Sequence, residues 1–247
     1  MYLKKININY FVYLIFIIYL ALGFYIYKDY GVGIEEHFQR KNGFYWLKYF
    51  LSFSDFDNIK LIANNKYQEI LNFNPDLPNI EFFNFYGILF DLPLAFLEVF
   101  FKIESSKTYF ELRHLINFLI FFVSSIFFYK ILKNRYFDQK FALIGLTFYI
   151  FTPRIFGDSF HNNKDILFLS LLTITIYYLF KLIDKFNYSN LFLFCLFAAF
   201  ATSTRIMGIY VPILLISFYF LEYLSSKKNL KSFFVDSFKI VFLFIIF

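Results

Sequence analysis

Long apolar segments alternate with short polar turns along most of the chain, and this alternation restricts the fold severely. Tyr10–Lys28 is almost wholly apolar, and Leu112–Leu132 and Ile166–Ile183 repeat the pattern. Of the 247 residues, 60% are hydrophobic, 43 are phenylalanine and only 17% are charged, whereas soluble domains average about 25% charged residues. A chain this short has too little interior to bury so much aromatic surface. We therefore expect an all-α polytopic membrane protein, with lipid as the solvent of most segments.

Basic residues cluster at alternate ends of the apolar segments and predict how the chain crosses the membrane. Lys4 and Lys5 precede the first segment, so the positive-inside rule places the N-terminus in the cytoplasm. The apolar run of Tyr10–Lys28 is longer than the core of a signal peptide, so we interpret it as an uncleaved span. About six to seven transmembrane helices are expected, the others at Leu112–Leu132, Lys140–Phe151, Ile166–Ile183, Asn190–Thr202, Ile209–Leu224 and from Phe233 onward. The cytoplasmic ends then carry Lys130, Lys133, Arg135, Lys181, Lys185, Lys227, Lys228 and Lys231.

The long stretch from about residue 29 to residue 106 is predicted to form the first external loop, with interfacial helices. Within it, Glu36–Leu51 is typical of an amphipathic helix whose apolar side chains rest on the bilayer surface. These side chains are Phe44, Trp46, Leu47, Tyr49 and Phe50. A second helix is expected over Asn84–Ile103, where apolar residues recur at helical spacing. Asp91 and Glu98 make it costly to insert, at about 2.5–3.5 kcal/mol for a central carboxylate, so we expect it to lie in the interface.

Four polar clusters fall on the external side of this topology. They are Asp29, Glu35, Glu36 and His37; Glu98, Arg113 and His114; Arg154, Asp158, His161, Asn162, Asn163, Lys164 and Asp165; and Arg205. One interpretation of the acidic cluster is a solvated loop that caps a transmembrane helix. The other is a reaction site at the membrane surface, because ionisable groups near lipid are costly and mark sites by default. The convergence of all four clusters on one face favours the second interpretation.

The residue types in these clusters suit proton transfer and contact with an anionic group. Glu35 or Glu36 can take a proton from an acceptor hydroxyl, so both are candidate catalytic residues. Arg205 is a candidate contact for an anionic group, because its guanidinium fork matches phosphate oxygens.

Other members of the clusters leave alternatives open. Arg113 is expected either to pair with Glu98 and hold an interfacial helix, or to bind substrate. Asp158 and His161 lie one helical turn apart, which suits substrate binding or, with two ligands only, a divalent metal. We expect no other cofactor, since the sequence has no Gly-rich phosphate loop and no paired His-Glu zinc motif. The single cysteine and the net charge of +6 indicate neither a disulfide framework nor a nucleic-acid partner.

Several motifs together resemble bacterial members of the GT-C glycosyltransferase superfamily. The most specific is Thr152-Pro-Arg-Ile-Phe-Gly-Asp-Ser-Phe-His-Asn-Asn-Lys-Asp165, and the others are Tyr30-Gly-Val-Gly-Ile-Glu-Glu-His37, Tyr86-Gly87, Phe96-Leu-Glu98 and Arg113-His114. The similarity covers nearly the whole chain and points to the branch related to protein O-mannosyltransferases and lipid A aminoarabinose transferases. In that family an acidic residue at the start of the first external loop, often Asp, acts as the base. The matching pair here is Glu35-Glu36, and His37 stands where relatives often have Pro.

The resemblance implies a membrane glycosyltransferase, more narrowly a hexosyltransferase of the cell envelope. A sugar would move from a polyprenyl-phosphate-linked donor to a protein, lipid or glycan acceptor on the outer face of the plasma (inner) membrane, with inversion. Membrane lipids would be its other partners. The departing polyprenyl phosphate would need cationic groups, and the candidate phosphate ligands are Arg154, Lys164 and Arg205. Residues 1–247 are expected to form one helical module, C-terminally truncated relative to the usual length of the family.

The alternative is a non-enzymatic membrane protein, either a lipid or sugar transporter component or an inactive truncated remnant. It predicts polar residues along a path through the membrane or on unrelated faces. A glycosyltransferase instead predicts that Glu35, Arg154 and Arg205 face one external cavity.

Overall fold

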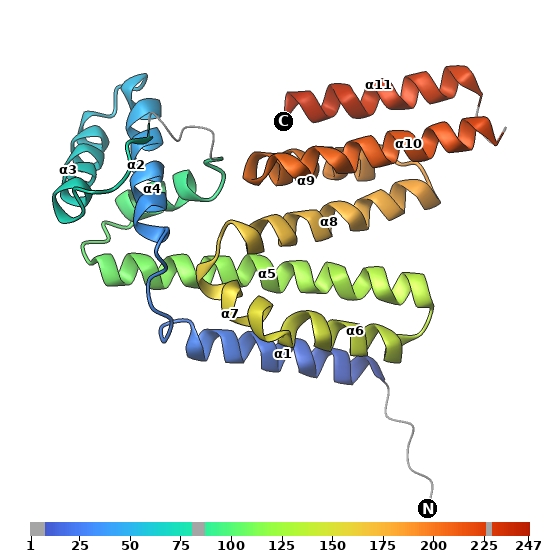
Figure 1. The fold of residues 1–247 in the computed structure, drawn as a ribbon, viewed down its shortest axis with the longest axis horizontal. Helices are drawn as coiled ribbons and strands as arrows, with labels where there is room; N and C mark the ends of the chain where they lie inside the picture. The colour runs from blue at the N-terminus through green and yellow to red at the C-terminus, as the bar shows by residue number, and fades with distance from the viewer. Residues whose placement is uncertain (1–7, 81–86, 226–228) are drawn as a thin grey trace, which may run out of the picture.

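The computed structural model describes residues 8–80, 87–225 and 229–247, and the regular structure of these ranges is helical (Figure 1). The all-α prediction is therefore confirmed. Some of the residues used above lie outside the described ranges: Lys4, Lys5, Tyr86, Lys227, Lys228 and the predicted helix start at Asn84.

The apolar helices run roughly side by side (Figure 1). They are α1 (Ile8–Ile26), α5 (Ser106–Tyr136), α6 (Gln139–Phe151), α8 (Asp165–Asp184), α9 (Tyr188–Thr204), α10 (Tyr210–Leu224) and α11 (Leu230–Ile246). Within the described ranges, three stretches are long and apolar enough to cross a membrane: Ser106–Tyr136, Asp165–Asp184 and Ile206–Leu224. Shorter apolar helices cover Tyr10–Ile26, Gln139–Phe151 and Tyr188–Thr204. The bounds of the apolar helices agree with the predicted segments to within about six residues, and the largest difference is at the start of α5.

Local sequence signals explain where several of these helices begin and end. Phe137 ends α5 in the left-handed region, with φ of 53°. Asp138 then caps α6, because its Oδ1 accepts a hydrogen bond from the amide of Lys140 at 2.7 Å. Asn187 and Asn229 cap α9 and α11 in the same way. Such caps satisfy amide groups that have no partner inside the helix.

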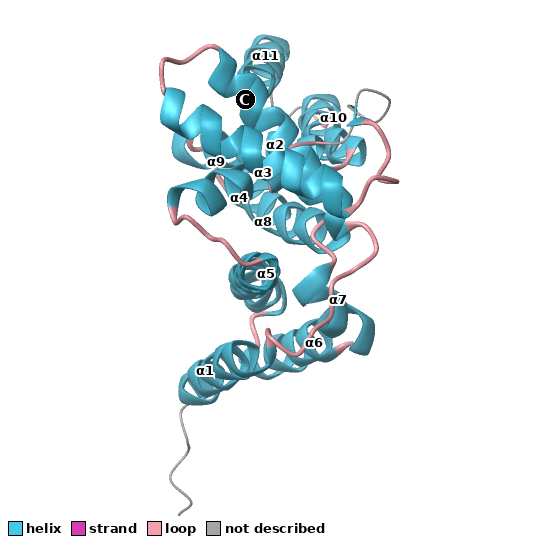
Figure 2. Cartoon of the chain, turned by 90° about the vertical axis from the view of Figure 1, so that its left-hand side faces the viewer, coloured by secondary structure: helices cyan, strands magenta, loops and turns pink. Residues whose placement is uncertain are grey.

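The predicted external loop folds into a helical unit at one end of the bundle. It comprises α2 (Glu36–Ser52), α3 (Asp57–Phe73) and α4 (Asp91–Phe100), and we call it the loop subdomain. Its apolar core contains Phe44, Leu47, Ala63, Ile70, Ala95 and Val99. Seen from its end in Figure 2, the subdomain is drawn over the α8–α10 side of the bundle, with α1 and α6 below it.

The loop subdomain corrects the expected placement of α2. Phe44 and Leu47 are buried against α3 and α4 rather than resting on a bilayer, because the subdomain supplies its own apolar partners. Tyr49 and Phe50 are about half exposed. The helix α3 occupies a region in which the sequence predicted none, and α4 begins only at Asp91.

The expected external turn at Thr152–Asn163 is largely helical. Pro153 occupies the first turn of α7 (Pro153–His161), where a residue without an amide hydrogen is readily accommodated. Asn117 of α5 holds this helix, because its amide donates a hydrogen bond to the carbonyl of Ser159 at 3.0 Å. The turn therefore packs against a long apolar helix and brings His161 and the residues after it to the subdomain end of the bundle.

Candidate active site

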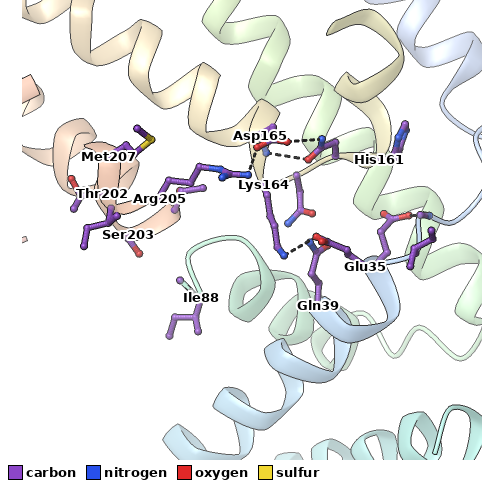
Figure 3. Close-up of a pocket in the computed structure, with 18 of the residues that line it drawn as sticks. Glu35, Gln39, Ile88, His161, Lys164, Asp165, Thr202, Ser203, Arg205 and Met207 are labelled. Atoms are coloured by element: carbon purple, nitrogen blue, oxygen red, sulfur yellow. Dashed lines mark hydrogen bonds and ion pairs between the residues drawn. The ribbon is translucent and has the colours of Figure 1, made fainter. Parts of the chain in front are cut away.

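A cavity of about 1280 Å³ lies between the loop subdomain and the ends of the apolar helices. Figure 3 shows side chains from the start of α2, from the α7–α8 junction and from the α9–η2 junction directed into it. The short 3-10 helix η2 (Ile206–Ile209) connects α9 to α10. Gly87 completes the wall, and a Cβ atom there would lie only 1.7 Å from the carbonyl oxygen of Ser203. Only glycine fits such a close approach of the chain to α9.

The start of α8 is fixed by its own side chains. The Oδ1 atom of Asn162 accepts a hydrogen bond from the amide of Asp165 at 3.0 Å, and its Nδ2 donates to the Asp165 carboxylate at 3.1 Å. This turn presents Lys164 to the cavity beside Asp165 (Figure 3).

Two ion pairs join the walls of the cavity, and we call them the rim pairs. Lys164 Nζ lies 2.6 Å from Glu35 Oε2 and so connects α8 to the start of α2. Arg205, at the end of α9, pairs with Asp165. The Glu35 side chain is 63% exposed, and those of Arg205 and Asp165 are about half exposed. The rim pairs therefore stand in contact with solvent.

Glu36 also lines the cavity, but its carboxylate is buried and held from several sides. Gly33 donates its amide hydrogen to Oε2 at 2.6 Å, and His114 Nε2 lies 3.2 Å from both carboxylate oxygens. Arg113 Nε lies 3.3 Å from Oε1. With 3% of its side chain exposed, Glu36 is fixed in place although it directly follows the exposed Glu35.

Behind Glu36 lies a buried charge cluster, formed by Glu36, Arg40, Asp91, Glu98 and Arg113. Arg113 also pairs with Asp91 at 3.1 Å and donates a hydrogen bond to Gln39. Glu98 instead binds Arg40, whose Nε donates to Oε2 at 3.1 Å. The predicted pair of Arg113 with Glu98 is therefore wrong, because Asp91 reaches Arg113 and α2 supplies a separate arginine to Glu98.

Burial sets the electrostatics of this cluster. Desolvation raises the pKa of Asp91, although the nearby Arg113 guanidinium opposes the shift. Burial likewise raises the pKa of Glu98, against the attraction of Arg40. His37, beside the cluster, has a lowered pKa because it is partly desolvated and faces the positive charge of Arg40.

The candidates on α7 separate into two groups. His161 lines the cavity, and its Nε2 lies 3.6 Å from Asp158 Oδ1. Asp158 also pairs with Arg154, whose side chain is 88% exposed. Neither Arg154 nor Asp158 lines the cavity, so the prediction that Arg154 faces it together with Glu35 and Arg205 is wrong for Arg154. Arg154 lies in the first turn of α7, far along the helix from the cavity. His161, the last residue of α7, lines the cavity. Across the described ranges, no group of three or more His, Cys, Asp or Glu side chains is placed to hold a metal ion.

Sequence reasoning overlooked several polar residues around the cavity. Gln39 and Asn42 project from α2, and both are buried. Asn163, which the sequence placed in an external polar cluster without a role of its own, precedes α8 and is buried as well. The signal for the α2 residues was present, since Glu36, Gln39, Arg40 and Gly43 follow helical spacing and form one face. Gly43 on that face indicates close packing, because a Cβ there would lie 2.4 Å from the carbonyl oxygen of Asp91.

Residues 92–247 match the family model described as dolichyl-phosphate-mannose-protein mannosyltransferase, which covers more than half of the chain. The matched range includes Arg113, Lys164 and Arg205, whereas Glu35 and Glu36 precede it. No curated protein and no solved structure matches the chain.

Proposed function

Because the chain belongs to the dolichyl-phosphate-mannose-protein mannosyltransferase family, a family of GT-C membrane glycosyltransferases, we propose that it transfers a sugar from a polyprenyl-phosphate carrier to an acceptor hydroxyl at the outer face of the membrane. One observation carries the proposal. An exposed carboxylate, Glu35, and two cationic side chains, Lys164 and Arg205, line the same cavity.

Glu35 is the base in this proposal. A general base has to come within hydrogen-bond distance of the acceptor proton, and the Glu35 side chain is 63% exposed in the cavity. Glu36 already accepts hydrogen bonds or ion pairs from Gly33, Arg113 and His114. We therefore assign Glu36 the role of a positioning residue that fixes the backbone on which Glu35 stands.

The reaction needs no covalent intermediate. The acceptor oxygen attacks the anomeric carbon, its proton moves to Glu35, and the bond from the anomeric carbon to the phosphate oxygen breaks with inversion. Lys164 and Arg205 balance the charge that develops on the departing polyprenyl phosphate. Both cations currently face carboxylates in exposed or partly exposed pairs worth about 0–1 kcal/mol each, so a phosphate group can replace those partners at little cost.

The arrangement of basic residues supports an outward-facing site. The α5 helix starts beside the loop subdomain and ends with Lys133 and Arg135 in its last turn, and α8 ends with Lys181 in its last turn. By the positive-inside rule, these ends face the cytoplasm and the subdomain faces outward. The proposal includes six to seven crossings in one module of the plasma (inner) membrane, with the short helix α9 ending at the cavity.

The decisive experiment measures transfer of labelled sugar from polyprenyl-phosphate mannose and polyprenyl-phosphate glucose to endogenous acceptors in membranes that contain the chain. Glu35→Gln is expected to lower the transfer rate about 100- to 10,000-fold, the usual contribution of a general base. Glu111→Gln is the matched control, because Glu111 pairs with Lys28 and Lys107 outside the cavity. Transfer that survives Glu35→Gln but not Glu36→Gln would overturn the assignment of the base, and no transfer by the unaltered chain would overturn the proposed function.

A further inference from the structure

A small recess with both polar and apolar walls adjoins the cavity and has no role in the proposed reaction. Its volume is about 30 Å³, and it shares Gln39, Gly87, Asn163, Lys164 and Thr204 with the walls of the main cavity. Asn42 and Asp91 also line it. The recess therefore opens beside the position where the proposed donor phosphate would meet Lys164.

Two buried amide groups in the recess have unused hydrogen-bonding capacity. Asn42 donates from Nδ2 to Asp91 Oδ2 at 3.3 Å, and Asn163 donates from Nδ2 to Asp91 Oδ1 at 3.5 Å. The Oδ1 atoms of Asn42 and Asn163 are buried and accept no hydrogen bond from any described part of the chain. Buried polar atoms are nearly always paired in folded proteins, so these two acceptors point to a ligand group that donates hydrogen bonds.

The size of the recess limits that group. About 30 Å³ accommodates one water molecule or one hydroxyl group, which is far too small for a sugar ring. The adjoining cavity of about 1280 Å³ is large enough for the ring and its phosphate. A sugar can therefore lie in the cavity with a single exocyclic group in the recess.

The charges around the recess favour a neutral group over an ammonium group. Asp91 supplies one negative charge, but it already pairs with Arg113. Lys164, which also lines the recess, pairs with Glu35. An ammonium group would bury a further charge beside carboxylates that already have cationic partners, which is costly, whereas a hydroxyl group can donate a hydrogen bond to one of the amide oxygens without adding charge.

From these observations we propose that the recess formed by Asn42, Asp91 and Asn163 binds one hydroxyl group of the transferred sugar and so selects donors that carry this hydroxyl. The inference rests on the proposed function, because it takes the donor to be a sugar phospholipid. A donor that lacks this hydroxyl would leave its amide oxygen acceptor buried and unpaired, and sites built to bind a hydroxyl reject such analogues strongly.

The test measures binding and transfer separately with the full chain purified into lipid nanodiscs. The probes are polyprenyl-phosphate mannose and polyprenyl-phosphate glucose, then each monodeoxy analogue and the corresponding amino analogues of the sugar that binds more tightly. We expect one monodeoxy donor to bind about 10- to 100-fold more weakly than its parent, and the amino analogue at that position to bind no better. The other monodeoxy donors should stay within about threefold of the parent, because ordinary surface contacts contribute little.

Variants of the two asparagines connect this selectivity to the recess. Asn163→Ala or Asn42→Ala, whichever removes the amide oxygen that accepts the hydroxyl proton, should reduce the discrimination against that monodeoxy donor to less than about threefold. Asn117→Ala is the matched control. Asn117 is equally buried and has an unpaired Oδ1, but it binds α7 outside both cavities and should leave the discrimination unchanged.

The outcomes separate the two proposals. Discrimination in binding without any transfer would overturn the proposed function and leave the recess assignment standing. Transfer with equal use of all monodeoxy donors would overturn the recess assignment, because only a water molecule then occupies it. Discrimination that persists in both asparagine variants would also overturn it, and no binding of any probe would overturn both proposals.

Discussion

Glu35 and Glu36 are neighbours with the same side chain, yet they belong to two different regions of the molecule. Glu35 belongs to the rim pairs and its side chain is 63% exposed, whereas Glu36 belongs to the buried charge cluster and its side chain is 3% exposed. The rim pairs can exchange their partners for substrate groups at little cost. The buried charge cluster cannot, so it holds the loop subdomain on α5 and positions Glu35 from one residue away.

The energies of the two regions differ for a physical reason. Exposed ion pairs contribute about 0–1 kcal/mol because water screens them. Removing one partner of a buried pair costs about 3–5 kcal/mol, since the other charge is left without compensation. The comparison therefore predicts that variants in the buried charge cluster change stability, and that variants at the rim change substrate binding.

The largest effect is expected for Arg113→Ala. It would leave the carboxylates of Glu36 and Asp91 buried without their shared arginine, so the free energy of unfolding should fall by about 3–5 kcal/mol. Thermal unfolding in detergent, followed by circular dichroism, measures the change. Arg154→Ala is the control, because this arginine is 88% exposed and its loss should cost less than about 1 kcal/mol. Equal losses in both variants would remove the distinction between buried and exposed charge.

A smaller loss is expected for Gly87→Ala, which tests the wall between the loop subdomain and α9. The new Cβ would meet the carbonyl oxygen of Ser203 at 1.7 Å, so the backbone would have to move, at a cost of about 1–3 kcal/mol. In Gly157→Ala the new Cβ meets nothing within 4 Å, and the helix α7 should become slightly more stable. The same unfolding measurement compares the two, and similar values would show that the wall is not tightly packed.

The pH dependence of stability sharpens the comparison further. Because burial raises the pKa of Asp91 in the folded state, its contribution to stability is fully present below the ordinary aspartate pKa of about 3.9. The contribution is lost as the pH rises through the raised value. Between the ordinary aspartate pKa of about 3.9 and the raised pKa of Asp91, the free energy of unfolding of the unaltered protein should therefore decrease with rising pH relative to that of Asp91→Asn. Unfolding curves of both proteins at a series of pH values measure this difference in free energy of unfolding. A difference that stays constant or increases with pH would contradict the raised pKa of Asp91.

The sequence predicts the bundle better than it predicts the loop subdomain. Runs of apolar residues determine α1, α5 and α8 locally, because lipid or a neighbouring helix accepts any apolar face. The helix α3 was missed because its polar composition resembles a solvated loop, and its apolar partners come from α2 and α4. The start of α7 could have been recognised from Pro153, a common first residue of helices.

The candidate site shows the same limit. The predicted topology and the residue types brought Glu35, Lys164 and Arg205 together as candidates, and all three line one cavity. The sequence could not choose the partner of Arg113, because Asp91 and Glu98 are seven residues apart and lie on the same face of α4. Which carboxylate meets Arg113 depends on how α4 docks on α5. Residue spacing along one helix carries no information about that docking.

The smallest stability effect, and the sharpest test of the rim, is expected for Arg205→Ala. Arg205 and Asp165 are about half exposed, so losing their pair should cost at most about 1 kcal/mol. Donor binding should weaken about tenfold or more, because a charge-assisted contact to phosphate is lost. Arg205→Lys should restore only part of that affinity, since lysine keeps the charge but not the planar fork of donors. Arg135→Ala, at the last turn of α5, is the control for net charge. Binding of polyprenyl-phosphate mannose to the purified variants gives the affinities. If Arg205→Ala left the affinity for the donor unchanged but greatly lowered stability, Arg205 would have the same structural role as Arg113. The rim pairs and the buried charge cluster would then no longer differ in function.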